Sequence, residues 1–182
     1  MHLISNLLDK PIITANEGRI VGAAKAFLFS PDWKSVTAVS LGGEGLFSRK
    51  FSVIVQNNIG LFGVDALLIK QASAPIDSSQ VAELATWFKR DDLKGRAIET
   101  PGGTKIGTIG DIIIDPQGQI IGFKLAQLLV QGTLANRGYI SRGCVVDLLT
   151  SGGLMTIDLA KAEQQTLGDK IELHKASEEV AA

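Results

Sequence analysis

The 182-residue chain contains an internal repeat, which constrains its fold more than any other feature of the sequence. When residues 7–41 are placed above residues 92–125, identical residues coincide at a constant spacing of 85: Leu8 with Leu93, Gly18 with Gly103, Gly22 with Gly107, and Pro31 with Pro116. Identities at glycine and proline carry extra weight because these residue types determine backbone geometry. The repeat predicts one compact unit that is folded twice along a single chain.

Each copy has the pattern of a small meander of strands. A short apolar stretch leads to a glycine turn, "NEG" or "PGG", and a longer strand rich in Ile, Val and Phe follows. That strand ends in a proline turn, "SPDWK" or "DPQGQ", and a third strand returns. About five or six short strands per copy, with closely spaced turns, predict a mainly β protein made of two small β-barrels in tandem.

The sequence between the two copies has a helical pattern instead. Val81, Leu84, Ala85 and Phe88 recur at helical spacing after Pro75, which predicts one short helix with its apolar stripe packed on a barrel. A second short helix, with Asp158 placed to cap it, is predicted near the C-terminus. The predicted segments are a first barrel at 1–72, a helical linker at 73–91, a second barrel at 92–158, and a C-terminal helix, the strand-like "KIELHK" and a frayed tail within 159–182.

The stretch "GGTKIGTIGDIIIDPQGQIIGFKL" at residues 102–125 is the segment most like a ligand-binding motif. A phosphate-binding loop needs lysine directly after its second glycine and then a helix, but Thr108 follows Gly107 and β-branched residues come next. The dinucleotide pattern G-x-G-x-x-G is absent from this stretch as well. We interpret its glycines as residues that form turns and bend a strand within a sheet.

Charge and the scarcity of reactive side chains argue against several function classes. Eighteen basic and 19 acidic residues leave a formal net charge of −1, which offers no general attraction to nucleic acid or to an anionic membrane. Cys144 is the only cysteine, and His2 and His174 are the only histidines, so we expect neither an intramolecular disulfide nor a Cys/His zinc site. We expect Cys144 to be a small buried hydrophobe, and we expect no cofactor and no enzymatic activity.

Asp111 is the carboxylate with the most unusual surroundings in the sequence, because isoleucines follow it. Asp115 lies four residues further on, roughly 13 Å along a strand, which is too far for a shared proton. The first copy has Ala26 at the matching position, which argues against a chemical role needed in both units. We expect Asp111 either on the outer face of the barrel or hydrogen-bonded at a bulge.

Four residues are candidates for contact with a partner protein: Trp33, Phe47, Trp87 and Arg90. Trp33 occupies a predicted hairpin tip, where its ring either folds back onto the barrel, which we favour, or faces a partner. Trp87 and its neighbour Phe88 point to different faces of the predicted helix, so one of them bridges the two units or faces a partner. Arg90 belongs to a basic cluster interrupted by two aspartates, and a solvated linker is the favoured interpretation there.

The segment "LKGRAIETPGGTKIGTIGDIIIDPQGQIIGF" at residues 93–123 resembles the PRC-barrel family in its Leu-Gly opening, glycine turn, aspartate in the second strand and return into an apolar strand. The first copy departs from that pattern at Lys10, where glycine is usual, and at Ala26. PRC barrels form the cytoplasmic domain of the H subunit of purple-bacterial photosynthetic reaction centres and the C-terminal part of a ribosome-maturation factor. The resemblance implies a docking or assembly module, and it carries over no catalytic residues.

These observations together lead us to expect a non-enzymatic adaptor or assembly module that docks onto a larger protein complex, with a photosynthetic or other membrane-bound complex as the preferred setting. We expect a cytoplasmic protein without a transmembrane segment, which reaches a membrane only through a partner. A homo-oligomer is compatible with these expectations. One alternative is a ribosome-associated maturation factor. Another is a small-molecule binder with a cleft between the barrels, marked by convergence of Asp111, Arg142 or His174.

Overall fold

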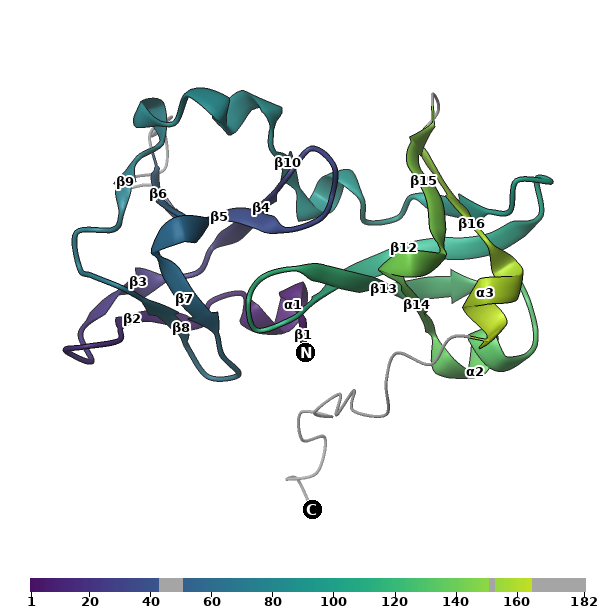
Figure 1. The fold of residues 1–182 in the computed structure, drawn as a ribbon, viewed down its shortest axis with the longest axis horizontal. Helices are drawn as coiled ribbons and strands as arrows, with labels where there is room; N and C mark the ends of the chain where they lie inside the picture. The colour runs from purple at the N-terminus through teal and green to yellow at the C-terminus, as the bar shows by residue number, and fades with distance from the viewer. Residues whose placement is uncertain (43–50, 151–152, 165–182) are drawn as a thin grey trace, which may run out of the picture.

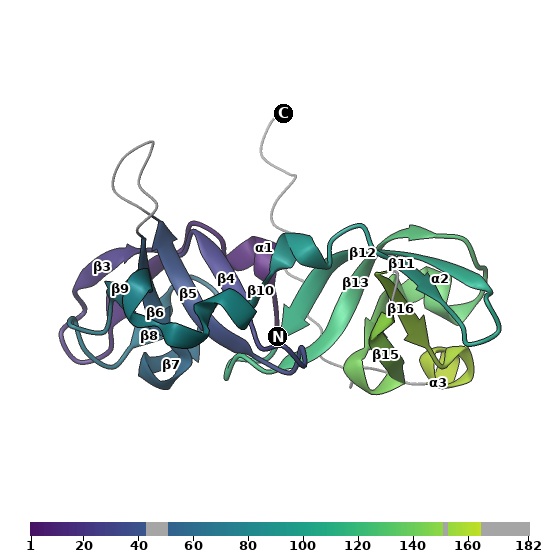
Figure 2. The same cartoon turned by 90° about the horizontal axis from the view of Figure 1, so that it is seen from above.

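The computed structural model describes residues 1–42, 51–150 and 153–164 of the chain. Two β-rich units lie side by side along the long axis of the molecule, with α1 (Ile4–Leu7) between them (Figures 1 and 2). The mainly β fold and the tandem arrangement confirm the predicted fold class. The described sheets are open at both ends, so the strands of neither unit close into a continuous hydrogen-bonded cylinder.

The first unit contains two sheets. Their strands are β2 (Pro11–Thr14), β3 (Ile20–Ala23), β4 (Ala26–Phe29), β5 (Val36–Gly42), β6 (Ser52–Val55), β7 (Ile59–Phe62), β8 (Leu67–Ile69), β9 (Ile76–Asp77) and β10 (Phe88–Lys89). A four-stranded sheet has the order β3-β2-β8-β7, and a five-stranded sheet has the order β10-β4-β5-β6-β9.

The second unit is built on one seven-stranded sheet. Its strands are β1 (His2–Leu3), β11 (Ala97–Glu99), β12 (Lys105–Ile114), β13 (Ile120–Leu128), β14 (Tyr139–Ser141), β15 (Val145–Thr150) and β16 (Leu154–Ile157). They follow the order β14-β13-β12-β11-β16-β15, and β1 pairs with β12 outside this path. One continuous strand, β12, stands where the first unit has β3 and β4, and this joins the second unit into a single sheet.

The glycine-rich stretch forms sheet, as predicted, because β12 and β13 account for most of it. At Gly107 a side chain is impossible, since a Cβ atom would lie 1.9 Å from the carbonyl oxygen of Gln127 on the facing strand. The pairing of β12 with β13 shifts register around Gly110, which is the bulge that bends the strand. These glycines allow close strand contact and a bulge in β12, and they do not form a phosphate-binding loop.

The duplication is confirmed by the order of the elements and by their pairing. The first strand of each meander runs parallel to the last one, β2 beside β8 and β11 beside β16. A 3-10 helix follows β6 and β14 alike, namely η1 (Gln56–Asn58) and η5 (Arg142–Cys144).

One detail of the predicted repeat alignment is wrong, because Leu7 and not Leu8 is the equivalent of Leu93. The carbonyl oxygen of Leu7 accepts a hydrogen bond from the N–H of Lys10, and that of Leu93 accepts one from Arg96 in the same way. Both leucines are buried, whereas Leu8 is only partly buried. The spacing changes by one residue because the turn after β2 is one residue longer in the first copy.

The same one-residue change in the alignment also changes which residue of the first copy stands in place of the family's usual glycine. Asp9 has a φ of 62° and donates its N–H to the carbonyl of Ala24, while Gly95 has a φ of 82° and donates to the carbonyl of Ile109. The departure therefore lies at Asp9 and not at Lys10. Aspartate is among the few non-glycine residues that tolerate left-handed backbone geometry.

The linker is helical, but it is two 3-10 helices instead of the single predicted helix. These are η2 (Ser78–Gln80) and η3 (Ala82–Thr86), and extended backbone at Val81 separates them. Val81 and Leu84 of the predicted stripe pack on buried residues of the first unit, together with Trp87. Ala85 is exposed and Phe88 belongs to β10, so the stripe covers the first unit only in part. A further 3-10 helix, η4 (Arg90–Asp92), leads into the second unit.

In the described part of its C-terminal half, the chain forms two short α-helices, α2 (Thr133–Arg137) and α3 (Leu159–Gln164). Asp158 caps α3 as predicted, because its carboxylate accepts the backbone N–H of Lys161 at 3.1 Å. The strand-like "KIELHK" and the predicted frayed tail lie outside the described residues.

A strand from the start of each unit pairs with the other unit. β1 precedes the first unit but pairs with β12 of the second, with His2 opposite Ile114. β10 precedes the second unit but pairs with β4 of the first, with Phe88 opposite Phe29. One hydrophobic cluster accordingly extends through both units and includes Phe27 from the first and Phe123 from the second.

Candidate functional site

Trp33, the first candidate partner contact, is tucked into the protein. Its side chain is 0% exposed and stacks between two rings, with centroids 5.5 Å from Phe29 and 5.1 Å from Phe88. Trp33 has a φ of 52° and occupies the turn position that Gly118 takes in the second unit. The hairpin tip thus turns the indole inward, which is the position favoured from the sequence, and the ring offers no exposed surface in this conformation.

Arg90, the second candidate, is not part of a solvated basic cluster. Its guanidinium Nε lies 2.9 Å from the carboxylate of Asp111, and the side chains of these two residues are 21% and 5% exposed. The other carboxylate oxygen accepts the backbone N–H of Ser5 at 3.0 Å. Asp111 is hydrogen-bonded beside the bulge in β12, which was one of its two predicted positions, and Arg90 neutralises it there.

Phe47, the third candidate, lies outside the described residues.

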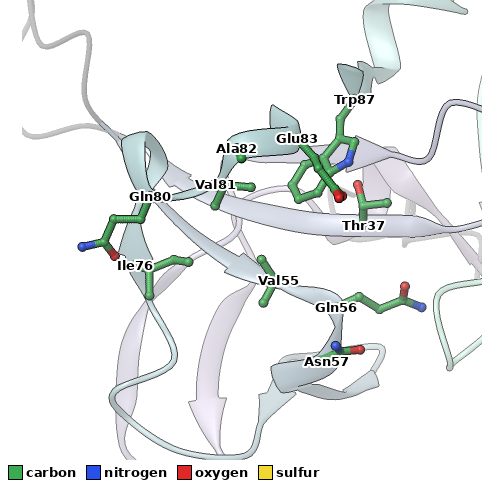
Figure 3. Close-up of a pocket in the computed structure, with 10 residues that line it drawn as sticks. All are labelled: Thr37, Val55, Gln56, Asn57, Ile76, Gln80, Val81, Ala82, Glu83 and Trp87. Carbon is green, nitrogen blue, oxygen red and sulfur yellow. The ribbon is translucent and has the colours of Figure 1, made fainter. Parts of the chain in front are cut away.

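Trp87, the fourth candidate, lies in an open groove on the first unit (Figure 3). The groove has a volume of about 480 Å³ and lies between the linker and strands β5 and β6. Its lining residues come from β5, β6, η1, β9, η2, η3 and the linker positions beside them: Thr37, Val55, Gln56, Asn57, Ile76, Gln80, Val81, Ala82, Glu83 and Trp87. Trp87 is half-buried, so its ring is both anchored and accessible.

The groove exists because the linker packs on the outer face of the five-stranded sheet. Leu28, Ala38 and Val53 form a small buried cluster on that face, and the linker residues Leu84 and Trp87 cover it. Because 3-10 helices are tighter than an α-helix and are broken at Val81, they leave space beside the sheet. At the start of the linker, the Asp77 carboxylate caps η2 by accepting the backbone N–H of Ser79 at 2.8 Å.

The groove combines aliphatic and amide side chains with one carboxylate. Its floor is aliphatic, its rim carries the amides of Gln56, Asn57 and Gln80, and Glu83 is the only charged member of the ten lining residues. Within the described part of the chain, no group of three or more His, Cys, Asp or Glu residues could hold a metal ion. Amides beside apolar surface can bind backbone groups and small side chains of a polypeptide.

Asp111 and Arg142, which one hypothesis expected to converge in a cleft between the two units, have separate partners. Asp111 is held by Arg90, and Arg142 donates instead to the carbonyl oxygens of Asp32 and Trp33, each at 3.4 Å. The structure therefore does not bring Asp111 and Arg142 together, and His174 lies outside the described residues.

Two titratable groups are perturbed by burial. Desolvation raises the pKa of the Cys144 thiol, and the thiol is buried as predicted. Partial burial lowers the pKa of His2 from its ordinary value of 6.5, and the N-terminal ammonium lowers it further. A buried thiol with a raised pKa is a poor nucleophile at neutral pH.

Comparison with known protein families decides what kind of fold this is. The profile of the PRC-barrel domain matches the chain twice, at residues 1–71 and 86–148. The chain belongs to the PRC-barrel family. Each match begins with the exchanged strand, so β1 and β10 are parts of their own PRC units although each pairs with the other one. Membership of this family indicates a binding or adaptor module.

No curated protein matches the chain closely enough to be named beside it. Among the described residues, no helix has the length and apolar character needed to cross a membrane.

Sequence reasoning found Trp87 but missed the rest of the groove. Gln56, Asn57 and Gln80 are polar residues at the ends of strands and turns, with no spacing that sets them apart. The one available signal was the apolar stripe of the linker, which predicted packing on a barrel. The position of the amides depends on how β6 and the linker meet, and that is a tertiary feature.

Proposed function

We propose that this tandem PRC-barrel protein is a non-enzymatic docking module, and that the groove beneath its linker holds an extended segment of a partner protein. The observation that carries the proposal is the half-buried ring of Trp87 facing an open groove whose walls are apolar and whose rim is lined with amides. Aromatic residues in such positions contribute strongly to protein recognition, because they bury a large area without losing much side-chain entropy.

The charge of the groove favours a partner segment that carries a basic side chain. Glu83 is the only ionisable residue among those lining the groove, so the segment that fits best pairs a basic side chain with a small apolar one. The basic side chain would contact both the Glu83 carboxylate and the face of Trp87. An acidic residue also disfavours the phosphate backbone of RNA, so the groove gives no support to a ribosomal RNA partner.

The setting we prefer is a large membrane-bound complex, of which a photosynthetic complex is the example that the family resemblance suggests. This narrower part of the proposal rests on the sequence resemblance, and the groove itself does not select it.

The proposal is tested by site-specific crosslinking in native extract. A photo-crosslinking amino acid placed at Gln80 should capture one partner protein, and mass spectrometry should map the crosslink to a segment that contains a basic residue. Trp87→Ala and Glu83→Lys should each reduce that crosslink about tenfold or more, as expected for a buried aromatic anchor and a reversed charge.

Val64→Ser is the matched control, because Val64 is exposed on the same unit and does not line the groove. The proposal is overturned if the crosslink persists in both groove variants, or if it maps to the partner equally well from position 64.

A further inference from the structure

The two PRC units contact each other reciprocally. At their hairpin tips, Val36 donates its backbone N–H to the carbonyl of Gly118 at 2.8 Å, and Ile120 donates to the carbonyl of Lys34 at 2.7 Å. Counted back from the strand that follows each turn, Val36 corresponds to Ile120 and Lys34 to Gly118. The first turn is one residue longer, which is why Gly118 matches Trp33 when the two turns are aligned on their prolines. The same hydrogen bond is therefore made twice, once in each direction, around an isolated bridge between Ser35 and Gln119.

The exchanged strands β1 and β10 also pair reciprocally, each with the equivalent strand of the other unit. His2 faces Ile114 in one pairing, and Phe88 faces Phe29 in the other. In the repeat His2 corresponds to Phe88, and Phe29 corresponds to Ile114. Each unit thus gives its first strand to the other and receives the equivalent strand in return. Figure 1 shows β1 and β10 near the middle of the molecule, where the units meet.

Contacts that pair i with j and j with i define a two-fold, isologous interface. Each unit carries both the surface that donates a strand and the surface that accepts one. A surface of this kind is self-complementary, because a second copy of the same unit presents the groups that the first one needs. The fold of this chain is in this respect a two-fold dimer whose halves are covalently joined.

One buried ion pair breaks the symmetry and directs the pairing. The second unit has Arg90 and Asp111 where the first has Ile4 and Ala26. Asp111 accepts the N–H of Ser5 from the first unit. In a contact between two second units, Asp91 would replace Ser5 and bring a like charge toward Asp111, so unlike units are favoured.

We propose that this reciprocal surface is a self-association surface, and that a second copy of this chain can occupy it, with the first unit of one copy paired to the second unit of the other. Within one chain the covalent linker makes the local concentration of the second unit high, so the dilute protein is a monomer. At high concentration during refolding, pairing between chains competes with pairing within a chain, as in domain swapping.

The bridge between Ser35 and Gln119 allows a direct test with the full chain. The flanking hydrogen bonds make these residues a non-hydrogen-bonded antiparallel pair, for which the Cα separation of about 4.5 Å suits a disulfide. In a Cys144→Ala background, one chain carries S35C and a second, differently tagged chain carries Q119C. The two are refolded together from urea at high and at low concentration.

We expect the heterodisulfide between the S35C and Q119C chains to exceed by about tenfold the yield from S35C mixed with E17C, and to increase with protein concentration. Glu17 is an exposed turn residue of the first unit, and it is not part of the reciprocal contact. A single chain carrying both S35C and Q119C should form an internal disulfide at every concentration.

Two results would overturn the proposal. If the double-cysteine chain closes its internal disulfide but the mixed chains give no more product than the control, the surface is not used between copies. If the double-cysteine chain folds and does not close, the two hairpin tips do not meet as described.

Discussion

The guanidinium Nε of Arg90 lies 2.9 Å from the carboxylate of Asp111, and this ion pair is present in only one of two otherwise equivalent positions. The first unit fills the matching positions with Ile4 and Ala26, which need no charge neutralisation. Both arrangements are self-consistent, since a buried charge requires a partner and an apolar pair does not. The first unit therefore shows which apolar residues can replace the ion pair in the second unit.

Arg90→Ile should leave Asp111 buried and unpaired, and should lower the free energy of unfolding by about 3 kcal/mol. Adding Asp111→Ala recreates the pair found in the first unit and should recover most of that loss. Urea denaturation measures both values. Lys25→Ala serves as the control, because its ion pair with Asp9 is exposed and should contribute under about 1 kcal/mol. A small effect of Arg90→Ile alone would contradict the buried-pair account.

Gly118→Ala should destabilise the protein more than Gly103→Ala does. Both glycines have a φ near 80°, so each substitution carries a left-handed backbone penalty of about 1–2 kcal/mol. A Cβ atom at Gly118 would also lie 2.6 Å from the ring of Phe62 in the first unit, whereas Gly103 has open space. We expect an extra penalty of about 1–3 kcal/mol for this overpacking.

Phe62→Leu tests whether the ring of Phe62 causes the extra penalty at Gly118. Thermal unfolding of the two single variants and of Gly118→Ala with Phe62→Leu should show a coupling energy of about 1 kcal/mol or more, because the smaller side chain relieves the clash. Additive effects would mean that the two residues do not touch.

The two units should unfold together, because one hydrophobic cluster and two exchanged strands join them. Cys144 reports on the second unit, since its buried thiol with a raised pKa should react with iodoacetamide only after unfolding. Tryptophan fluorescence reports on the first unit, because Trp33 and Trp87 both pack on its strands. We expect the same urea midpoint from both probes, and Leu3→Ala should lower both midpoints equally. Labelling of Cys144 at clearly lower urea would show that the units unfold separately.

Stability should decrease as the pH falls below neutrality, with His2 as one source. The pKa of His2 is 6.5 when exposed and lower in the folded protein, so the unfolded chain binds the proton more readily. The stabilising contribution is complete above pH 6.5 and is lost as the pH falls from there through the lowered pKa of the folded state. His2→Gln should reduce this dependence, and His174→Gln should retain it if His2 is the source. Urea midpoints between pH 7.5 and 5 decide the matter.

Sequence reasoning succeeded where the outcome depends on local backbone preferences. The glycine and proline turns, the strands between them and the cap at Asp158 follow from residues only a few positions apart. One error is local as well: the repeat alignment slipped by one residue at Leu7 because a single turn differs in length.

The sequence alone determined that one β-rich unit occurs twice, because turn residues restrict φ and ψ regardless of what surrounds them. Only the tertiary structure decided that each unit lends a strand to the other, that Trp33 points inward, that Arg90 neutralises Asp111 and that the linker leaves a groove. A two-residue strand such as β1 or β10 has no periodicity to detect. Its partner is also distant along the chain, since His2 pairs with Ile114 and Phe88 pairs with Phe29. Such pairings are selected by the burial and hydrogen bonding of the whole assembly, which no local stretch encodes.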